Sequence, residues 1–86
     1  MRKDMTNTLD LVVNEIAATM DVPPASLRPD TLLADIGMDS LQALQLLVAL
    51  EQSAKIQLEE EDLRRFTTVR SIVDLLNMRW EKAGAA

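Results

Sequence analysis

Apolar residues follow helical spacing in three stretches of the chain, and prolines and polar runs separate these stretches. The first stretch has its large apolar residues at steps of three and four, at Leu9, Val12, Val13, Ile16 and Met20. This spacing is typical of one face of an amphipathic helix. The helix must end before Pro23-Pro24, because a proline donates no backbone hydrogen bond and restricts the residue before it.

A long loop is expected next, from about Asp21 to Met38, because all three prolines of the chain and Gly37 fall within it. The loop also contains four large aliphatic residues, Leu27, Leu32, Leu33 and Ile36. A polar linker would not need them. We therefore expect the loop to lie packed across the core.

The second apolar stretch begins at Asp39-Ser40, where Asp39 has a side chain suited to a helix N-cap. The run from Leu41 to Gln52 is rich in strong helix formers and is apolar around most of its circumference. It is expected to be the central and most buried helix. The solvent side of this helix is marked by Gln42, Gln45, Glu51 and Gln52.

Two more helical segments follow the turn at Ile56 and Leu58. Residues 59–66 suit a short helix, with acids at its positive end and arginines at its negative end. Thr67 or Thr68 is expected to cap a last helix, whose inward residues are Val69, Ile72, Val73, Leu75 and Leu76, with Trp80 covering the edge of the core. The sequence thus predicts one all-α domain over 1–86. It is a small four-helix bundle of three main helices, one short helix and a long first loop, with its core at about 9–80 and frayed ends at 1–5 and 81–86.

The chain contains no His and no Cys. The commonest general base, the commonest metal ligand and the thiolate nucleophile are therefore missing, so neither catalysis by this chain alone nor a resident metal is expected. The acidic run Glu59-Glu60-Glu61-Asp62 lacks the residue spacing of a calcium-binding loop, and it is interpreted as a solvated helix N-terminus.

The net charge of −5 is unevenly distributed. Residues 21–62 carry nine acids against Arg28 and Lys55, whereas residues 63–86 carry five basic residues against two acids. An acidic middle disfavours nucleic acid and anionic membranes and favours basic partner surfaces, although such acids also keep a small domain soluble without any partner. No apolar run follows the basic start of the chain, so neither a signal peptide nor a membrane span is expected, and we expect a cytoplasmic protein.

The segment from Asp35 to Leu41 carries the candidate chemistry. Gly37 allows a sharp turn, Asp39 caps the next helix, and Ser40 then stands in the first helical turn with its hydroxyl exposed. The free N–H groups and positive dipole end of that helix favour an anion, so a phosphodiester on Ser40 would be stabilised there. No base is supplied to activate the hydroxyl, which favours a phosphate-linked modification over self-catalysis. Taken alone, however, Asp-Ser-Leu is also an ordinary helix start.

From about residue 9 to 78 the chain resembles the acyl and peptidyl carrier proteins of fatty-acid, polyketide and nonribosomal peptide synthesis. The matching segments are Leu32–Leu41, the central helix as far as Leu50-Glu51, and Phe66–Ile72. The elements Gly-x-Asp-Ser-Leu and Thr-Val-x-x-Ile lie at the separation which that family shows.

The resemblance implies that Ser40 is the attachment point of 4'-phosphopantetheine, which a separate magnesium-dependent transferase adds from coenzyme A. Asp39 would cap the helix and help to position the metal of that transferase, and Leu41 would dock on partner enzymes beside the arm. The family's partner-recognition positions correspond to Gln42, Gln45, Val48, Glu51 and Gln52. Its core or cleft positions correspond to Leu46, Leu50, Leu63, Phe66 and Ile72.

Some residues depart from one branch of that family. Fatty-acid carriers usually have acids where this chain has Gln42 and Gln45, and Gly-Met-Asp-Ser-Leu with several arginines after Asp62 is more similar to polyketide carriers. The leading hypothesis is a freestanding, monomeric, non-catalytic acyl carrier of a specialised-metabolite pathway, polyketide or hybrid. Its partners would be the phosphopantetheinyl transferase and a ketosynthase, acyltransferase or other acyl-processing enzyme, with no nucleic acid and no membrane.

Four alternatives remain. The chain could be a domain excised from a larger synthase, an aminoacyl or peptidyl carrier, or a helical interaction module that is never modified. An intact Ser40 argues against the unmodified module. A hydrolase with Ser40 as its nucleophile is disfavoured because the chain supplies no base for that serine.

Overall fold

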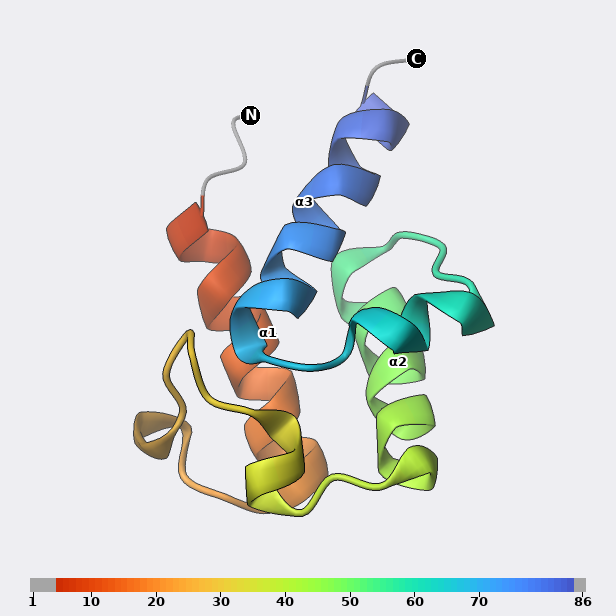
Figure 1. Cartoon of the computed structure of the whole chain (residues 1–86). Coiled ribbons are helices and arrows are strands. Elements are labelled where there is room, and N and C mark those ends of the chain that lie inside the picture. The colour runs from red at the N-terminus through yellow and green to blue at the C-terminus, as the bar shows by residue number, and fades with distance from the viewer. Residues whose placement is uncertain (1–4, 85–86) are drawn as a thin grey trace.

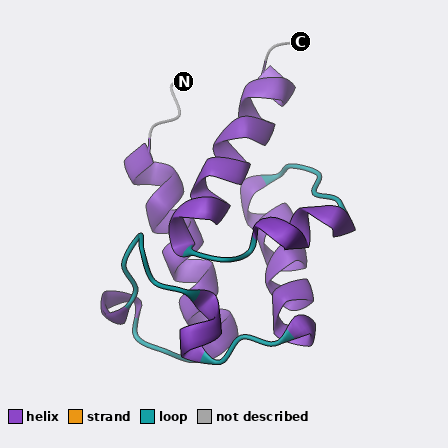
Figure 2. Cartoon of the chain, viewed as in Figure 1, coloured by secondary structure: helices purple, strands orange, loops and turns teal. Residues whose placement is uncertain are grey.

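The computed structural model describes the backbone of residues 5–84, which form three long helices joined by short 3-10 turns (Figures 1 and 2). The long helices are α1 (Met5–Met20), α2 (Ser40–Ala54) and α3 (Val69–Gly84), and the 3-10 helices are η1 (Pro24–Ser26), η2 (Leu33–Ile36) and η3 (Glu60–Arg65). No strand occurs among these residues. The predicted all-α class, with three main helices, one short helix and a long first loop, is confirmed. The turns η1 and η2 within that loop were not predicted.

The core lies where the three long helices meet. α1 packs against both α2 and α3, and α2 begins at the end of the bundle where α1 finishes (Figure 1). Each helix buries one apolar face, with fully buried side chains at Val12, Ile16, Leu46, Leu50, Ile72 and Leu76. The prediction that α2 is the central and most buried helix is wrong, because Leu41, Leu44 and Val48 of α2 are exposed and α1 is the helix that packs against both of the others. α2 therefore packs against α1 with one side, and its opposite side faces solvent. None of the helices within 5–84 is long and apolar enough to cross a membrane.

The loop between α1 and α2 crosses the bundle as predicted, and backbone hydrogen bonds tie it to the start of α3. Leu33 N donates to Thr67 O (2.9 Å), and Val69 N donates to Thr31 O (3.2 Å). Leu27 and Leu33 are buried, whereas Leu32 is 47% exposed, so packing of Leu32 into the core was a wrong prediction. The reason is local: Leu32 bridges to Thr68 in extended geometry, and successive side chains of an extended segment point to opposite sides.

Two of the long helices end on a residue other than glycine in the left-handed region. Asp21, directly after α1, has φ 58°, and Lys55, directly after α2, has φ 56°. Val22 N then donates to Ala17 O, and Lys55 N donates to Glu51 O, which satisfies carbonyls at the helix ends. The chain can therefore turn sharply at both points.

The expected fraying of residues 1–5 and 81–86 stays a prediction. Residues 1–4 and 85–86 lie outside the part that the structure describes, and residue 5 and residues 81–84 belong to helices.

Candidate functional site

The site begins with the cap of α2. Asp39 adopts an extended conformation before the helix, and its Oδ1 accepts a hydrogen bond from Gln42 N (2.9 Å). In return, Asp39 N donates to Gln42 Oε1 (3.2 Å), which completes a capping box. The predicted N-cap is therefore confirmed, and the part played by Gln42 was not foreseen. Ser40 is the first residue of the helix that this cap fixes.

Gly37 supplies the turn that leads the chain into the cap. Its φ is 85°, as the sequence suggested, and Met38 N donates back to Leu33 O (3.1 Å). A residue with a side chain rarely adopts this backbone conformation, whereas glycine reaches it at no steric cost. The turn lets the chain leave η2 and enter α2 after only three residues, 37–39.

Ser40 is exposed and lies at the edge of a pocket of about 210 Å³. The buried residues Leu33 and Phe66 and the half-buried Ala43 and Leu63 line this pocket together with Asp39 and Ser40. The pocket thus joins an apolar lining to a polar rim at the helix N-terminus. Leu63 and Phe66 were predicted to line the core or the cleft, and both contribute to it.

The chemistry of the site suits an ester acceptor. The N-terminus of a helix stabilises an anion through its free N–H groups and its dipole, which favours a phosphodiester on Ser40. The nearest carboxylate in sequence, that of Asp39, already accepts the Gln42 N–H in the cap. Within the described part of the chain, no three or more acidic side chains gather closely enough to hold a metal ion. The arrangement can accept a phosphate-linked group on Ser40.

The predicted partner positions on α2 fall into two groups. Leu41 (64% exposed), Gln45, Val48 and Gln52 lie on the outer surface of the helix. Glu51 and Gln42 are half-buried and make contacts within the domain, Glu51 through an Oε2 that accepts from Leu58 N (2.9 Å) and Gln42 through the capping box.

Leu44 also lies on the outer surface of α2, although it was not among the residues predicted to mark the solvent side of that helix. Leu44 is 40% exposed and lies three residues after Leu41 and four before Val48. That spacing was the signal for its position, because residues three and four apart share one helix face.

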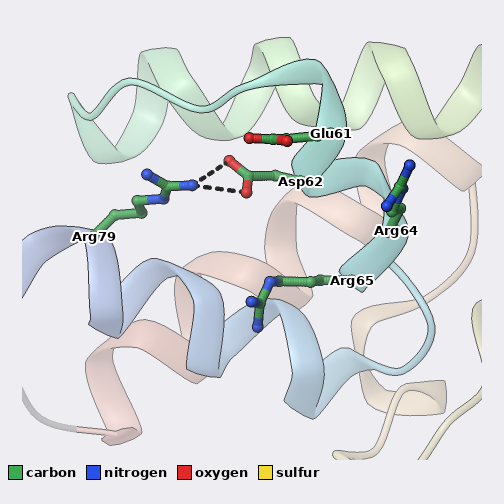
Figure 3. Close-up of a pocket in the computed structure, with 5 residues that line it drawn as sticks. All are labelled: Glu61, Asp62, Arg64, Arg65 and Arg79. Carbon is green, nitrogen blue, oxygen red and sulfur yellow. Dashed lines mark hydrogen bonds and ion pairs between the residues drawn. The ribbon is translucent and has the colours of Figure 1, made fainter.

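A second pocket, of about 420 Å³, is lined by Glu61, Asp62, Arg64, Arg65 and Arg79 (Figure 3). In it the Asp62 carboxylate accepts two hydrogen bonds from Arg79 Nη2, at 2.7 and 2.9 Å, and one from Glu59 N at 2.8 Å. Asp62 is only 4% exposed. The ion pair fastens η3 to the C-terminal half of α3, so the interpretation of Asp62 as part of a solvated acidic run was wrong.

The environment of Asp62 changes its acidity. Burial alone raises its pKa, but the Glu59 N–H, the hydrogen-bonded Arg79 and the charge of Arg65 together outweigh burial and hold the pKa of Asp62 below its ordinary value. The carboxylate is therefore ionised and paired at neutral pH.

Comparison with known proteins places this geometry in context. Residues 10–76 match the family model described as a phosphopantetheine attachment site. The chain is 32% identical over 77 residues to "Acyl carrier protein 4, chloroplastic" of Arabidopsis thaliana; the match covers 90% of this chain and 54% of that protein, so the chain spans about half of that relative's length. It is 33% identical over 72 residues to an acyl carrier protein of Clostridium perfringens, with 84% of each chain covered.

Proposed function

This chain belongs to the phosphopantetheine-binding acyl carrier protein family, and from that premise we propose that Ser40 is the residue to which its 4'-phosphopantetheine is attached. The family consists of non-catalytic carriers, and its prosthetic group, when bound, supplies a thiol that holds an acyl chain as a thioester. The remaining question is which residue of this protein carries the group.

The assignment of the group to Ser40 rests on the hydrogen bonds that the serine hydroxyls make. The chain has four serines, and three hydroxyls are engaged: Ser26 donates to Pro23 O, Ser53 donates to the Glu15 carboxylate, and Ser71 bonds to several groups at the start of α3. The Ser40 hydroxyl makes no hydrogen bond within the described residues, and the residue is exposed. Ser40 is therefore the serine whose oxygen can be esterified without breaking an existing contact.

The surroundings of Ser40 fit the group. The first turn of α2 provides backbone N–H groups and a positive dipole end for a phosphodiester, and the Asp39–Gln42 capping box keeps that turn in place. Phe66 and Leu63 add an apolar lining beside the attachment point. The chain's own part in carrier function is to hold Ser40 outward on a rigid helix while partner enzymes do the chemistry.

The test is modification of the purified apo protein. We expect incubation with coenzyme A, Mg²⁺ and a broad-specificity phosphopantetheinyl transferase to raise the intact mass by one phosphopantetheine. Ser40→Ala should gain nothing, while Ser53→Ala, which removes an engaged serine, should be modified like the parent. Circular dichroism of each variant checks that it is folded. A folded parent that stays unmodified, or a Ser40→Ala protein that gains the group, overturns the proposal.

The outer surface of α2 is the proposed docking surface for the enzymes that act on the arm. It comprises Leu41, Leu44, Gln45, Val48 and Gln52, called the outer α2 surface below, and it starts one residue after Ser40. Gln42 and Glu51 support it from within by holding the two ends of the helix. Asp39 contributes as the cap, and it is the proposed residue that helps to position the metal of the transferase.

The proposed cargo is an acyl intermediate of a polyketide or hybrid pathway. Support comes from Gln42 and Gln45, which stand where fatty-acid carriers usually have acids, and from the arginines that follow Asp62. The partners would then be a ketosynthase and an acyltransferase; a cytoplasmic location and a monomeric state stay predictions. Offering the holo protein to a malonyl-specific acyltransferase and to an aminoacyl-loading enzyme separates the cargo classes. Aminoacyl loading alone would contradict the polyketide assignment.

A further inference from the structure

Three arginines surround the pocket of Figure 3, although the chain as a whole is acidic. Arg64 and Arg65 of η3 and Arg79 of α3 line it together with Glu61 and Asp62. Three cations against two carboxylates leave one positive charge in excess, whereas the whole chain carries a net charge of −5. None of these residues belongs to α2, so the pocket is separate from the outer α2 surface. A positive pocket on an acidic protein attracts anions to that place.

The two carboxylates do not satisfy the arginines. Asp62 accepts its side-chain hydrogen bonds from Arg79 through Nη2 alone, and Nε of Arg79 is buried with no hydrogen-bond partner in the described part of the chain. The charge of Arg65 also acts on Asp62, but no ion pair joins them. Among the described residues, Arg64, Arg65 and Glu61 form no ion pair. The pocket therefore contains guanidinium donors for which these residues provide no acceptor.

From this arrangement we propose that the pocket is a binding site for an oxyanion, a carboxylate or phosphate group held between Arg65 and the exposed part of Arg79. Arg65 extends from η3 toward α3, and Arg79 extends from α3 toward η3 (Figure 3). A planar guanidinium group matches the paired oxygens of such anions, and hydrogen bonds between ionised partners are stronger than neutral ones. Arg64 adds to the positive potential from the neighbouring position. A volume of about 420 Å³ admits the group together with water.

Two sources can supply the oxyanion. One is a free ion, such as phosphate, and the other is the terminal carboxylate of a dicarboxylic acyl group carried on the arm. Leu63, which lines the pocket beside Ser40, directly follows Asp62, so the two pockets share the short helix η3. Only the second source rests on the proposed function, because it takes Ser40 as the attachment point.

The first test titrates the apo protein, labelled with ¹⁵N, with inorganic phosphate at pH 7. The side-chain Nε–H of Arg79 is the NMR reporter, because its burial shields it from exchange with water. We expect a saturable shift of this signal that NaCl at equal ionic strength does not reproduce. Arg65→Gln should weaken phosphate binding about three- to ten-fold, between the contributions of exposed and of buried charged hydrogen bonds. Arg28→Gln, which removes the same charge at an exposed arginine outside the pocket, should bind like the parent.

Some results of this titration would overturn the inference. A shift that does not saturate, or that NaCl reproduces, would mean that the pocket responds to ionic strength alone. Equal weakening by Arg28→Gln and Arg65→Gln would mean that net charge, and not the pocket, attracts the anion. Circular dichroism checks that each variant is folded. Arg65→Lys provides a second variant, which keeps the charge but loses the planar fork and should bind more weakly than the parent.

The second test distinguishes the two sources. A phosphopantetheinyl transferase loads the apo protein from succinyl-coenzyme A or from butyryl-coenzyme A, so that the two cargoes differ in a terminal carboxylate. If the succinyl form alone shifts the Arg79 Nε–H signal, and Arg65→Gln abolishes that shift, the site takes the carboxylate of the cargo. If phosphate binds and the two loaded forms give the same signal, the site takes an ion from solution. Absence of any loading at Ser40 would refute the proposed function and leave the phosphate titration as the test of this pocket.

Discussion

The ion pair between Asp62 and Arg79 makes a quantitative prediction about how η3 is held in place. The perturbation is Asp62→Asn, which keeps the side-chain volume and the oxygen that can face Glu59 N, but removes the negative charge. The neighbouring Glu61→Gln is the matched control, because Glu61 belongs to the same 3-10 helix and lines the same pocket but is exposed. The two variants thus differ in burial and pairing.

The magnitude follows from the contacts of the carboxylate. Asp62 accepts from Arg79 Nη2 at 2.7 and 2.9 Å, and a hydrogen bond to a charged group contributes about 1.5–3 kcal/mol. Breaking a fully buried ion pair costs about 3–5 kcal/mol, but the Arg79 side chain is 27% exposed and water can replace part of what it loses. We therefore expect Asp62→Asn to lower the free energy of unfolding by about 2 kcal/mol. For a domain of this size that is a fall of roughly 8–16 °C in Tm.

Urea unfolding, followed by circular dichroism and by the fluorescence of the single Trp80, measures the change. Glu61→Gln should stay within about 0.5 kcal/mol of the parent. The folded-state pKa of Asp62 lies below its ordinary value of 3.8, so the pair stabilises the fold fully above that pH. The stabilisation is lost as the pH falls through the lowered pKa, and the parent and Asp62→Asn should converge there.

Two results would refute this reasoning. If Asp62→Asn and Glu61→Gln unfold at the same urea concentration, the pair does not hold η3. If the difference between the parent and Asp62→Asn persists unchanged in acid well below pH 3.8, the lost interaction is not that of an ionised carboxylate.

Three further changes test the turns and caps by the same urea assay. Gly37→Ala should destabilise the domain by about 1 kcal/mol, because φ is 85° there although the space around an added Cβ is open; a larger loss would mean a steric clash. Lys55→Gly should stabilise it by about 0.5–1 kcal/mol, because Lys55 holds φ 56° at the end of α2; destabilisation would mean that the Lys55 side chain matters. Ser71→Ala should cost about 1–2 kcal/mol, because the hydroxyl of Ser71 bonds to Thr68 N (3.0 Å) and Thr68 O (2.8 Å) at the start of α3, and an unchanged midpoint would show that water replaces it.

Much of the fold was predictable because its determinants are local. The helical stripes of α1 and α3, the stop before Pro23 and the cap at Asp39 each depend on residues within a few positions of one another. The left-handed conformations of Asp21 and Lys55 were not predictable, since neither residue is the glycine that usually marks such a helix end. The exposed position of Leu32 depends on its bridge to Thr68, which is distant in sequence.

The candidate site likewise has some features that could be predicted from the sequence and others that could not. The turn at Gly37, the cap at Asp39 and the exposure of Ser40 follow from one short motif, and the structure agrees with all three. The burial of Asp62 could not be predicted, because Arg79 lies seventeen residues away and the acids before Asp62 are exposed. The hydrogen bond that Leu58 N donates to the Glu51 carboxylate could not be predicted either, because it depends on the path of the backbone after α2.

The short helix η3 contributes residues to both of the pockets described above, and this affects the space beside Ser40. Leu63 belongs to the lining beside Ser40, while Asp62, the residue directly before it, is tied to Arg79. Because Asp62 and Leu63 are adjacent residues of the 3-10 helix η3, we expect a displacement of Asp62 to shift Leu63 as well. The space beside Ser40 that the proposed thioester-bound acyl group would enter therefore depends partly on the Asp62–Arg79 ion pair, although neither of these two residues lines that pocket.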